Sequence, residues 1–252
     1  MKKSKKLVVG NWKMNPKTVL EAKNIVMNVK KTTARLKNVE TVVCPPFVYL
    51  PVIAPLVSTT ISLGAQNAFA ESLGAHTGEI SFAQLPQFRV EYVILGHSER
   101  RAMGENDEVI NKKVLSVTGE GMTAVLCVGE KIRDKQGEYF SIVRQQLESD
   151  LKNLSKKSLD NLVIAYEPIW AIGASEAMNT HDIHEMFIFI KKVLRELYGP
   201  LGDSVRIIYG GSVSPDNAAE IIRDGFVQGL LVGRDSVDSK KFVEIIRNVD
   251  CV

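Results

Sequence analysis

Eight short runs of apolar and β-branched residues recur along the 252-residue chain, and their number and spacing restrict its possible folds more than any other feature. Runs of this kind are typical of strands that are buried on both faces, as in a parallel sheet. Most of them are separated by stretches of helical period, and such alternation indicates βαβ units. The runs span residues 7–9, 41–44, 61–65, 92–95, 123–127, 162–165, 205–209 and 230–232.

The stretches between the runs carry helix signals. Residues 19–29 have one apolar face, and Asn15 and Pro16 before them fit a helix cap and a first helical position. A second helix is expected to begin at Thr180 and to end at Gly199. Each helix can therefore return the chain to the start of the next strand.

The length of the chain favours a closed barrel. Eight units in 252 residues give about 31 residues per unit, the size of one strand–helix unit in a closed (β/α)8 barrel. An open doubly wound sheet is the alternative, but eight units without a break in composition favour closure. We expect residues 1–252 to form a single α/β domain, with eight parallel strands inside an outer ring of helices.

Composition excludes several classes of protein. A net charge of +3 gives no case for nucleic-acid binding, and no stretch approaches a membrane span. Residues 2–6 are basic like the start of a signal peptide, but the apolar run behind them is too short. Cys44, Cys127 and Cys251 lack metal-ligand spacing, and so few cysteines favour a reducing compartment, which we expect to be the cytoplasm.

Glycines, amides and ionisable residues follow nearly every apolar run. In a (β/α)8 barrel the loops after the strands meet at one rim, and catalytic groups lie there. We therefore expect one site at this rim, built from residues that directly follow the strands, among them Asn11, Lys13, His97, Glu130 and Glu167.

Glu167 is the candidate general base. It ends the sixth run and precedes Pro168, Ile169, Trp170, Ala171, Ile172 and Gly173. Loops are usually polar, so an apolar loop between a proline and a glycine is better explained as a lid that closes over Glu167. The alternative is a structural carboxylate held in an ion pair.

His97 and Lys13 are the candidate electrophiles. No second His or Cys stands near His97 at metal-ligand spacing, which leaves a general acid or a donor to a carbonyl oxygen, or a structural histidine. A helix that begins at Ser98 would disfavour a charged imidazole. Lys13 can bind an anion, although most lysines are simply solvated. Glu99 can pair with Lys13 or Arg100.

The last two strands end in glycines that suit a phosphate. Gly210-Gly211-Ser212 and Gly233-Arg234 offer bare backbone N–H groups, and the loops after strands seven and eight are the usual phosphate site of this architecture. Tight turns without a ligand are the alternative. Cys127 is expected to be a small buried hydrophobe.

Together these segments resemble the triosephosphate isomerase family nearly from end to end, and the fold would be the TIM barrel. The stretches that carry the resemblance are Gly10-Asn11-Trp12-Lys13-Met14-Asn15, Gly96-His97-Ser98-Glu99-Arg100-Arg101, Ala165-Tyr166-Glu167-Pro168-Ile169-Trp170-Ala171-Ile172-Gly173 and Tyr209-Gly210-Gly211-Ser212-Val213.

The resemblance implies interconversion of dihydroxyacetone phosphate and D-glyceraldehyde 3-phosphate in glycolysis and gluconeogenesis, without cofactor or metal. Glu167 would move a proton between the two carbons and His97 would move one between the two oxygens of an enediolate. Asn11 and Lys13 would stabilise the negative oxygen and bind substrate. Backbone N–H groups would hold the phosphate at Gly173, Ser212, Gly233 and Arg234, and residues 168–178 would close as a lid.

The resemblance also implies a homodimer. Residues 66–80 resemble the loop by which the family dimerises, and Thr77 would reach the partner's site and support Asn11 and Lys13. An independent surface loop is the alternative.

Two departures from the family pattern stand out. Ala174-Ser175-Glu176 replaces the usual Thr-Gly-Lys after Gly173, which concerns lid motion more than chemistry. Arg234 stands where the family often has a second glycine, and a positive φ there would strain its backbone. We expect Arg234 to have ordinary backbone and to pair with Glu176 or Asp235.

Two rival functions remain open from the sequence. One is another phosphosugar barrel, such as an aldolase that forms a Schiff base through Lys13. The other is a catalytically silent barrel with a binding or scaffold role, against which the joint presence of Asn11, Lys13, His97 and Glu167 argues.

Overall fold

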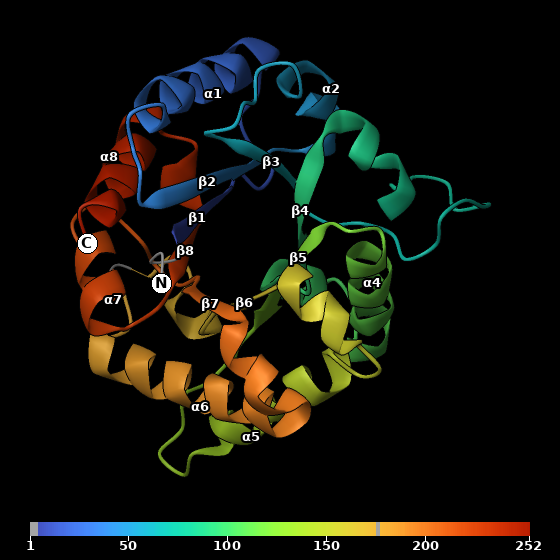
Figure 1. Cartoon of the computed structure of the whole chain (residues 1–252), viewed down its shortest axis with the longest axis vertical. Coiled ribbons are helices and arrows are strands. Elements are labelled where there is room, and N and C mark those ends of the chain that lie inside the picture. The colour runs from blue at the N-terminus through green and yellow to red at the C-terminus, as the bar shows by residue number, and fades with distance from the viewer. Residues whose placement is uncertain (1–4, 175–176) are drawn as a thin grey trace.

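The computed structural model describes residues 5–174 and 177–252. Within this part of the chain, eight parallel strands close into a barrel in sequence order, which confirms the expected fold. Figure 1 shows the barrel with the helices around it. The strands are β1 (Lys6–Asn11), β2 (Val39–Cys44), β3 (Ser62–Ala65), β4 (Val90–Leu95), β5 (Thr123–Val128), β6 (Leu162–Tyr166), β7 (Arg206–Tyr209) and β8 (Gly229–Val232).

Pairing between the first and last strands closes the barrel. β1 pairs with β2 from Lys6↔Val39 onward. On its other edge β1 pairs with β8 from Leu7↔Gly229 onward. Gly229 permits this approach, because a Cβ on it would lie 2.0 Å from the carbonyl oxygen of Leu7. A side chain at this position would therefore disrupt the seam.

An α-helix follows each strand except β3, after which the chain reaches β4 through two short 3-10 turns, Phe82–Gln84 and Pro86–Phe88. The helices are α1 (Val19–Thr33), α2 (Leu50–Ile53), α3 (Ser98–Ala102), α4 (Asp107–Gly119), α5 (Glu138–Asp150), α6 (Thr180–Tyr198), α7 (Ala218–Asp224) and α8 (Ser239–Asp250). None of the helices in the described ranges is both long and apolar enough to cross a membrane.

The predicted start of α1 is wrong. The N-cap is Thr18, not Asn15, because the Thr18 hydroxyl accepts from the Glu21 N–H while the Glu21 carboxylate accepts from the Thr18 N–H. This reciprocal pair satisfies two backbone donors at once, which a cap at Asn15 would not do.

Two apolar layers hold the barrel together. Side chains alternate between the two faces of a strand, so Leu7 and Val9 point into the barrel while Val8 packs with the core under the helices. The interior layer consists of Leu7, Val9, Val42, Cys44, Tyr92, Ile94, Val125, Cys127, Val163, Ala165, Ile208 and Leu231. The loops after the strands are thus mounted on a filled barrel.

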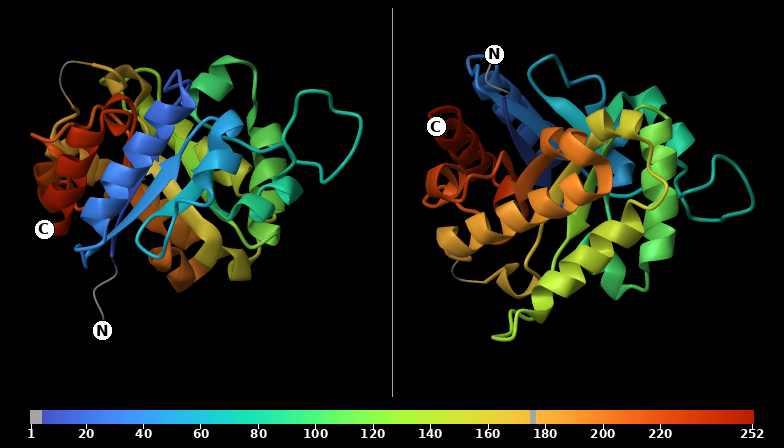
Figure 2. Two further views of the ribbon diagram at one scale, coloured as in Figure 1. Left: turned by 90° about the horizontal axis from the view of Figure 1, so that it is seen from above. Right: turned by 60° about the horizontal axis from the view of Figure 1, so that its bottom comes forward.

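One segment leaves the body of the molecule. The loop after β3 projects beyond the ring of helices (Figure 2), and residues 71–79 are exposed throughout. Its base is held by Phe69, whose N–H donates to the Ile80 carbonyl at 2.7 Å.

Candidate active site

Glu167 and His97 face one another at the rim where the strands end. Glu167 directly follows β6, and His97 lies two residues after β4. His97 Nε2 and Glu167 Oε1 are 3.4 Å apart, and both residues are buried. A carboxylate and an imidazole that are held this close can exchange protons with one small molecule between them.

Two glycines pack closely against Glu167. A Cβ on Gly129 would lie 1.9 Å from the Glu167 carbonyl oxygen, and a Cβ on Gly210 would lie 2.7 Å from Glu167 Cγ. Glu167 Oε2 is buried and has no hydrogen-bond partner within the described residues. A buried carboxylate oxygen without a partner is costly unless a ligand provides one.

Cys127 touches the same carboxylate and remains a thiol, as the sequence predicted. Burial raises the pKa of the Cys127 thiol well above the ordinary value, and the negative charge of Glu167 raises it further. Cys127 therefore packs beside the Glu167 carboxylate as a small apolar group and is not a nucleophile.

The N-terminus of α3 fixes the tautomer of His97. His97 is the N-cap residue, and its Nδ1 accepts from the backbone N–H of Glu99 at 3.2 Å. Because a backbone N–H can only donate, Nδ1 carries the lone pair and the ring proton lies on Nε2. Nε2 lies on the side of the ring that faces Glu167.

Arg101 anchors the loop that carries His97, a role that sequence reasoning missed. Its Nε donates to the Gly96 carbonyl at 2.8 Å, and its Nη2 pairs with buried Asp150 at 2.6 Å. Asp150 lies at the end of α5, far from position 101 in the sequence, so no local pattern revealed the pair.

Lys13 adopts a backbone conformation that only its surroundings explain. Its φ is +52°, which is costly for a residue with a side chain. Asn11 Oδ1 accepts from its N–H at 3.0 Å, and Gln66 Nε2 donates to its carbonyl at 2.8 Å. Gln66 also donates to the Cys44 carbonyl at 2.8 Å and thereby ties three strand ends together.

Glu99 pairs with Lys13 and not with Arg100. Lys13 Nζ and Glu99 Oε1 are 2.6 Å apart, whereas Arg100 pairs with Glu105 at 2.6 Å. Of the two partners that the sequence left open, the structure therefore selects Lys13, and the ammonium group is held at the rim.

The apolar loop after Glu167 is anchored by Glu130. Trp170 Nε1 donates to Glu130 Oε1 at 2.9 Å, and the Tyr166 hydroxyl donates to both carboxylate oxygens at 3.0 and 3.1 Å. Glu130 is fully buried. Burial and the nearby Glu130 raise the pKa of Tyr166, so it remains a donor.

The four residues expected to hold a phosphate lie along one side of the rim. The Ser212 hydroxyl donates to the Ala174 carbonyl, next to Gly173, at 2.8 Å. Lys13 Cε lies 3.6 Å from where a Cβ on Gly233 would be, and Arg234 Nη2 lies 3.5 Å from the corresponding position on Gly173. The loop that ends at Ala174, the turns at Ser212 and Gly233, and Lys13 are therefore close to one another.

Arg234 has ordinary backbone, as expected, since it is not among the described residues with positive φ. The expected pairing with Asp235 is wrong, because Asp235 pairs with Lys241 at 3.2 Å. Glu176, the other expected partner, lies outside the described residues.

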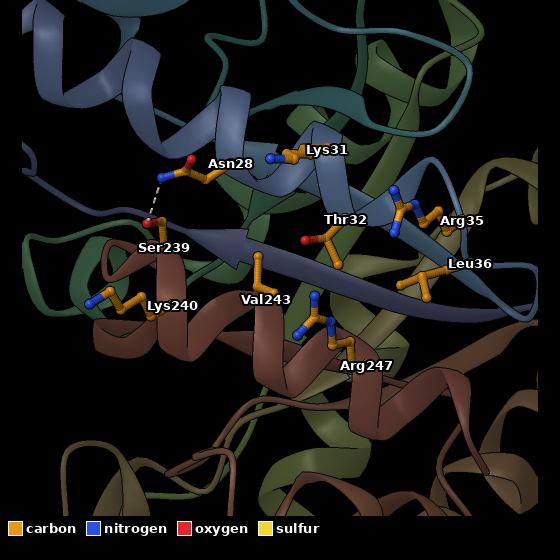
Figure 3. Close-up of a pocket in the computed structure, with 9 residues that line it drawn as sticks. All are labelled: Asn28, Lys31, Thr32, Arg35, Leu36, Ser239, Lys240, Val243 and Arg247. Atoms are coloured by element: carbon orange, nitrogen blue, oxygen red, sulfur yellow. Dashed lines mark hydrogen bonds between the residues drawn. The ribbon is translucent and has the colours of Figure 1, made fainter.

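A groove on the outside of the barrel has no part in this site. This groove, of about 520 Å³, runs between α1 and α8, and Thr32, Leu36, Val243 and Arg247 are among the residues that line it (Figure 3). It lies in the helical layer and contains none of the residues at the rim.

The fold and this rim define a (β/α)8-barrel enzyme with a buried carboxylate opposite an imidazole, and with a lysine and glycine turns nearby. Among families of that class, the family model "Triosephosphate isomerase" matches residues 6–249. The chain belongs to the triosephosphate isomerase family.

Individual members of the family match this chain over nearly their full length. The chain is 39% identical to the triosephosphate isomerase of Endomicrobium trichonymphae over 246 residues, which cover 96% of this chain and 98% of the relative. It is 42% identical to that of Thermodesulfovibrio yellowstonii, with 96% and 99% covered. It is 41% identical to the triosephosphate isomerase of Carboxydothermus hydrogenoformans, with 96% of this chain and 98% of the relative covered.

Proposed function

We propose that this chain is an intramolecular aldose–ketose isomerase that interconverts dihydroxyacetone phosphate and D-glyceraldehyde 3-phosphate, a step of glycolysis and gluconeogenesis. The observation that carries the proposal is the 3.4 Å approach of His97 Nε2 to Glu167 Oε1 in a buried pocket. Membership of the triosephosphate isomerase family supports the same conclusion.

Glu167 acts as the base in this proposal. Its carboxylate removes a proton from the carbon beside the carbonyl and returns it to the neighbouring carbon, so no net proton is gained or lost. The partnerless Oε2 supports this role, because a buried lone pair without a donor is free to accept the proton.

His97, Asn11 and Lys13 stabilise the enediolate between the two proton transfers. His97 Nε2–H moves a proton between the two substrate oxygens, and the Lys13 ammonium and the Asn11 amide offset the negative charge. Removing one such donor costs roughly 3–4 kcal/mol of transition-state stabilisation in comparable sites. The hydrogen bond between Asn11 and Lys13 supports their joint action.

The phosphate group is held by backbone N–H groups at Gly173, Ser212, Gly233 and Arg234, and residues 168–178 close over it. Part of this lid, at 175 and 176, lies outside the described residues. The Ser212 contact with the lid carbonyl of Ala174 supports a closure in which the cradle and the lid meet. Closure would exclude water from the intermediate.

A coupled assay for isomerisation of glyceraldehyde 3-phosphate tests the proposal, with Glu167→Asp as the diagnostic variant. Shortening the side chain withdraws the base by about 1 Å, and a misplacement of that size costs on the order of 100-fold in rate. We expect kcat to fall by about that factor while the fold is retained. An unchanged rate in Glu167→Asp would show that Glu167 is not the base.

The Schiff-base aldolase is the main rival. Lys13 Nζ is engaged by Glu99 at 2.6 Å, an arrangement that suits an anion-binding ammonium better than an amine nucleophile. Borohydride trapping in the presence of substrate separates the two, because covalent capture at Lys13 would favour the aldolase.

The assembly in this proposal is a homodimer of single-domain subunits in the cytoplasm. The projecting loop supports it, since Leu73 is 79% exposed on that loop and Thr77 lies four residues further on. An exposed leucine on a projecting loop is favourable where a partner covers it. Sedimentation tests the dimer, and a fully active monomer would refute it.

A further inference from the structure

Arg234 lies at the junction of the lid and the proposed phosphate cradle. It opens the short helical turn Arg234–Ser236 that follows β8, and its side chain is exposed. Its Nη2 lies 3.5 Å from the position that a Cβ on Gly173 would occupy. The guanidinium therefore reaches across from the eighth strand's loop to the lid.

Lys13 occupies a comparable position on the neighbouring part of the cradle. Its Cε lies 3.6 Å from the position that a Cβ on Gly233 would occupy. Two cationic side chains thus lie next to glycines of the proposed phosphate cradle, Lys13 at Gly233 and Arg234 at Gly173. Lys13 is half-buried and forms an ion pair with Glu99, whereas Arg234 is exposed to solvent.

Arg234 forms no ion pair with any residue in the ranges 5–174 and 177–252. Its neighbour Asp235 is engaged by Lys241. Within the same ranges, Arg35, Arg89 and Arg247 also form no ion pair. The remaining arginines have carboxylate partners, namely Arg100, Arg101, Arg133, Arg144, Arg195, Arg206 and Arg223. A guanidinium that lies beside Gly173, where no side chain intervenes at the glycine itself, is well placed for an external dianion, which it can bind through two N–H groups.

We propose that the Arg234 guanidinium binds the phosphoryl dianion of the substrate, as a second cation beside Lys13. This inference rests on the proposed function, and it adds a side-chain contact to the backbone contact expected at this position. A contact that is made equally in the ground state and the transition state lowers KM and leaves kcat nearly unchanged, and we expect the Arg234 contact to be mainly of this kind.

The test compares Arg234→Gln, Arg234→Lys and the control Lys240→Gln with the wild type. Lys240 lies on α8 beside the outer groove (Figure 3), so its replacement removes the same charge away from the rim. The probe is inorganic phosphate, whose Ki as a competitive inhibitor and Kd by calorimetry are measured at constant ionic strength. KM and kcat are measured in the coupled assay.

We expect Arg234→Gln to raise the phosphate Ki, the phosphate Kd and the KM by about tenfold, within the range of one charge-assisted contact. The fall in kcat should be smaller than the rise in KM. Arg234→Lys should recover part of the affinity because it restores the charge, and Lys240→Gln should match the wild type.

Two outcomes would overturn the assignment of Arg234. One is an Arg234→Gln variant whose phosphate Ki and Kd stay within twofold of the wild type. The other is a Lys240→Gln variant that loses as much affinity, because the effect would then be one of net charge. A wild type that does not isomerise the substrate would instead refute the proposed function, so the two failures are distinguishable.

Discussion

At the scale of single residues, the position of Glu167 depends on two glycines that leave space for it. Gly129 leaves space for its backbone and Gly210 leaves space for its Cγ. Neither glycine has a positive φ, so conformational freedom does not explain them. The space that they leave for Glu167 explains them. If Glu167 is the base as proposed, an added methyl group at Gly210 should act on catalysis rather than on the backbone.

Gly210→Ala should displace the Glu167 carboxylate, because the new Cβ would lie 2.7 Å from Cγ and 3.3 Å from Oε1. We expect kcat to fall by about 100-fold, as for other misplacements of a catalytic group near 1 Å. Gly119→Ala is the matched control, since a Cβ there meets nothing within 4 Å, and its kcat should be unchanged. If Gly210→Ala kept kcat within twofold of the wild type, the base would not depend on this clearance.

The sequence predicted the identities of the rim residues better than their conformations. Asn11, Lys13, His97 and Glu167 could be chosen because each follows an apolar run. The left-handed backbone of Lys13 could not be foreseen, because a lysine carries no preference for it. It is held from outside by Gln66, 53 positions away, through a contact that exists only once the strands are assembled.

At the scale of elements, two patterns competed for the start of α1. Asn15-Pro16 fits a cap followed by proline, but Thr18 and Glu21 form the capping box that the structure uses. The Thr-x-x-Glu spacing was present in the sequence, so this miss was one of weighing local signals. The anchoring of Trp170 by Glu130 is different, because 40 residues separate them and only the barrel brings them together.

Thr18→Ala should weaken α1 without touching the rim. It removes the acceptor for the Glu21 N–H, a loss that typically costs about 1 kcal/mol of unfolding free energy. Urea unfolding should show this decrease, while Lys17→Ala, an exposed neighbour outside the box, should unfold like the wild type. Equal stability of the two variants would mean that the capping box contributes nothing.

At the scale of the whole molecule, the end of the barrel opposite the active site is closed by polar groups from three strands. Arg206 Nη1 on β7 pairs with Glu40 Oε2 on β2 at 2.7 Å, and the Tyr92 hydroxyl on β4 donates to the same carboxylate. The sequence predicted the barrel from eight similar runs, but each of these residues looked like an isolated polar position at a strand. Their partnership depends on closure of the ring.

Glu40→Gln should lower stability in a pH-dependent way. Burial opposes ionisation of Glu40, but the hydrogen bond from Tyr92 and the contact with Arg206 outweigh it, and the pKa is lowered from 4.5. A lowered carboxyl pKa means that the unfolded state takes up the proton first as the pH falls. The Glu40 contribution is therefore fully present above about pH 4.5 and is lost as the pH falls through the lower, folded-state pKa.

We expect Glu40→Gln to cost about 1.5–3 kcal/mol of unfolding free energy near neutral pH, the range for hydrogen bonds to a charged group. The difference from the wild type should shrink once the pH is below the folded-state pKa, because the wild-type carboxyl is then neutral as well. Urea unfolding across this range at one protein concentration measures both effects, since association would also stabilise the folded state. Glu244→Gln, on the exposed face of α8, should follow the wild type at every pH. If the stability difference between Glu40→Gln and the wild type stayed constant down to the lowest pH, it would be due to packing. The charge of Glu40 would then have no part in closing this end of the barrel.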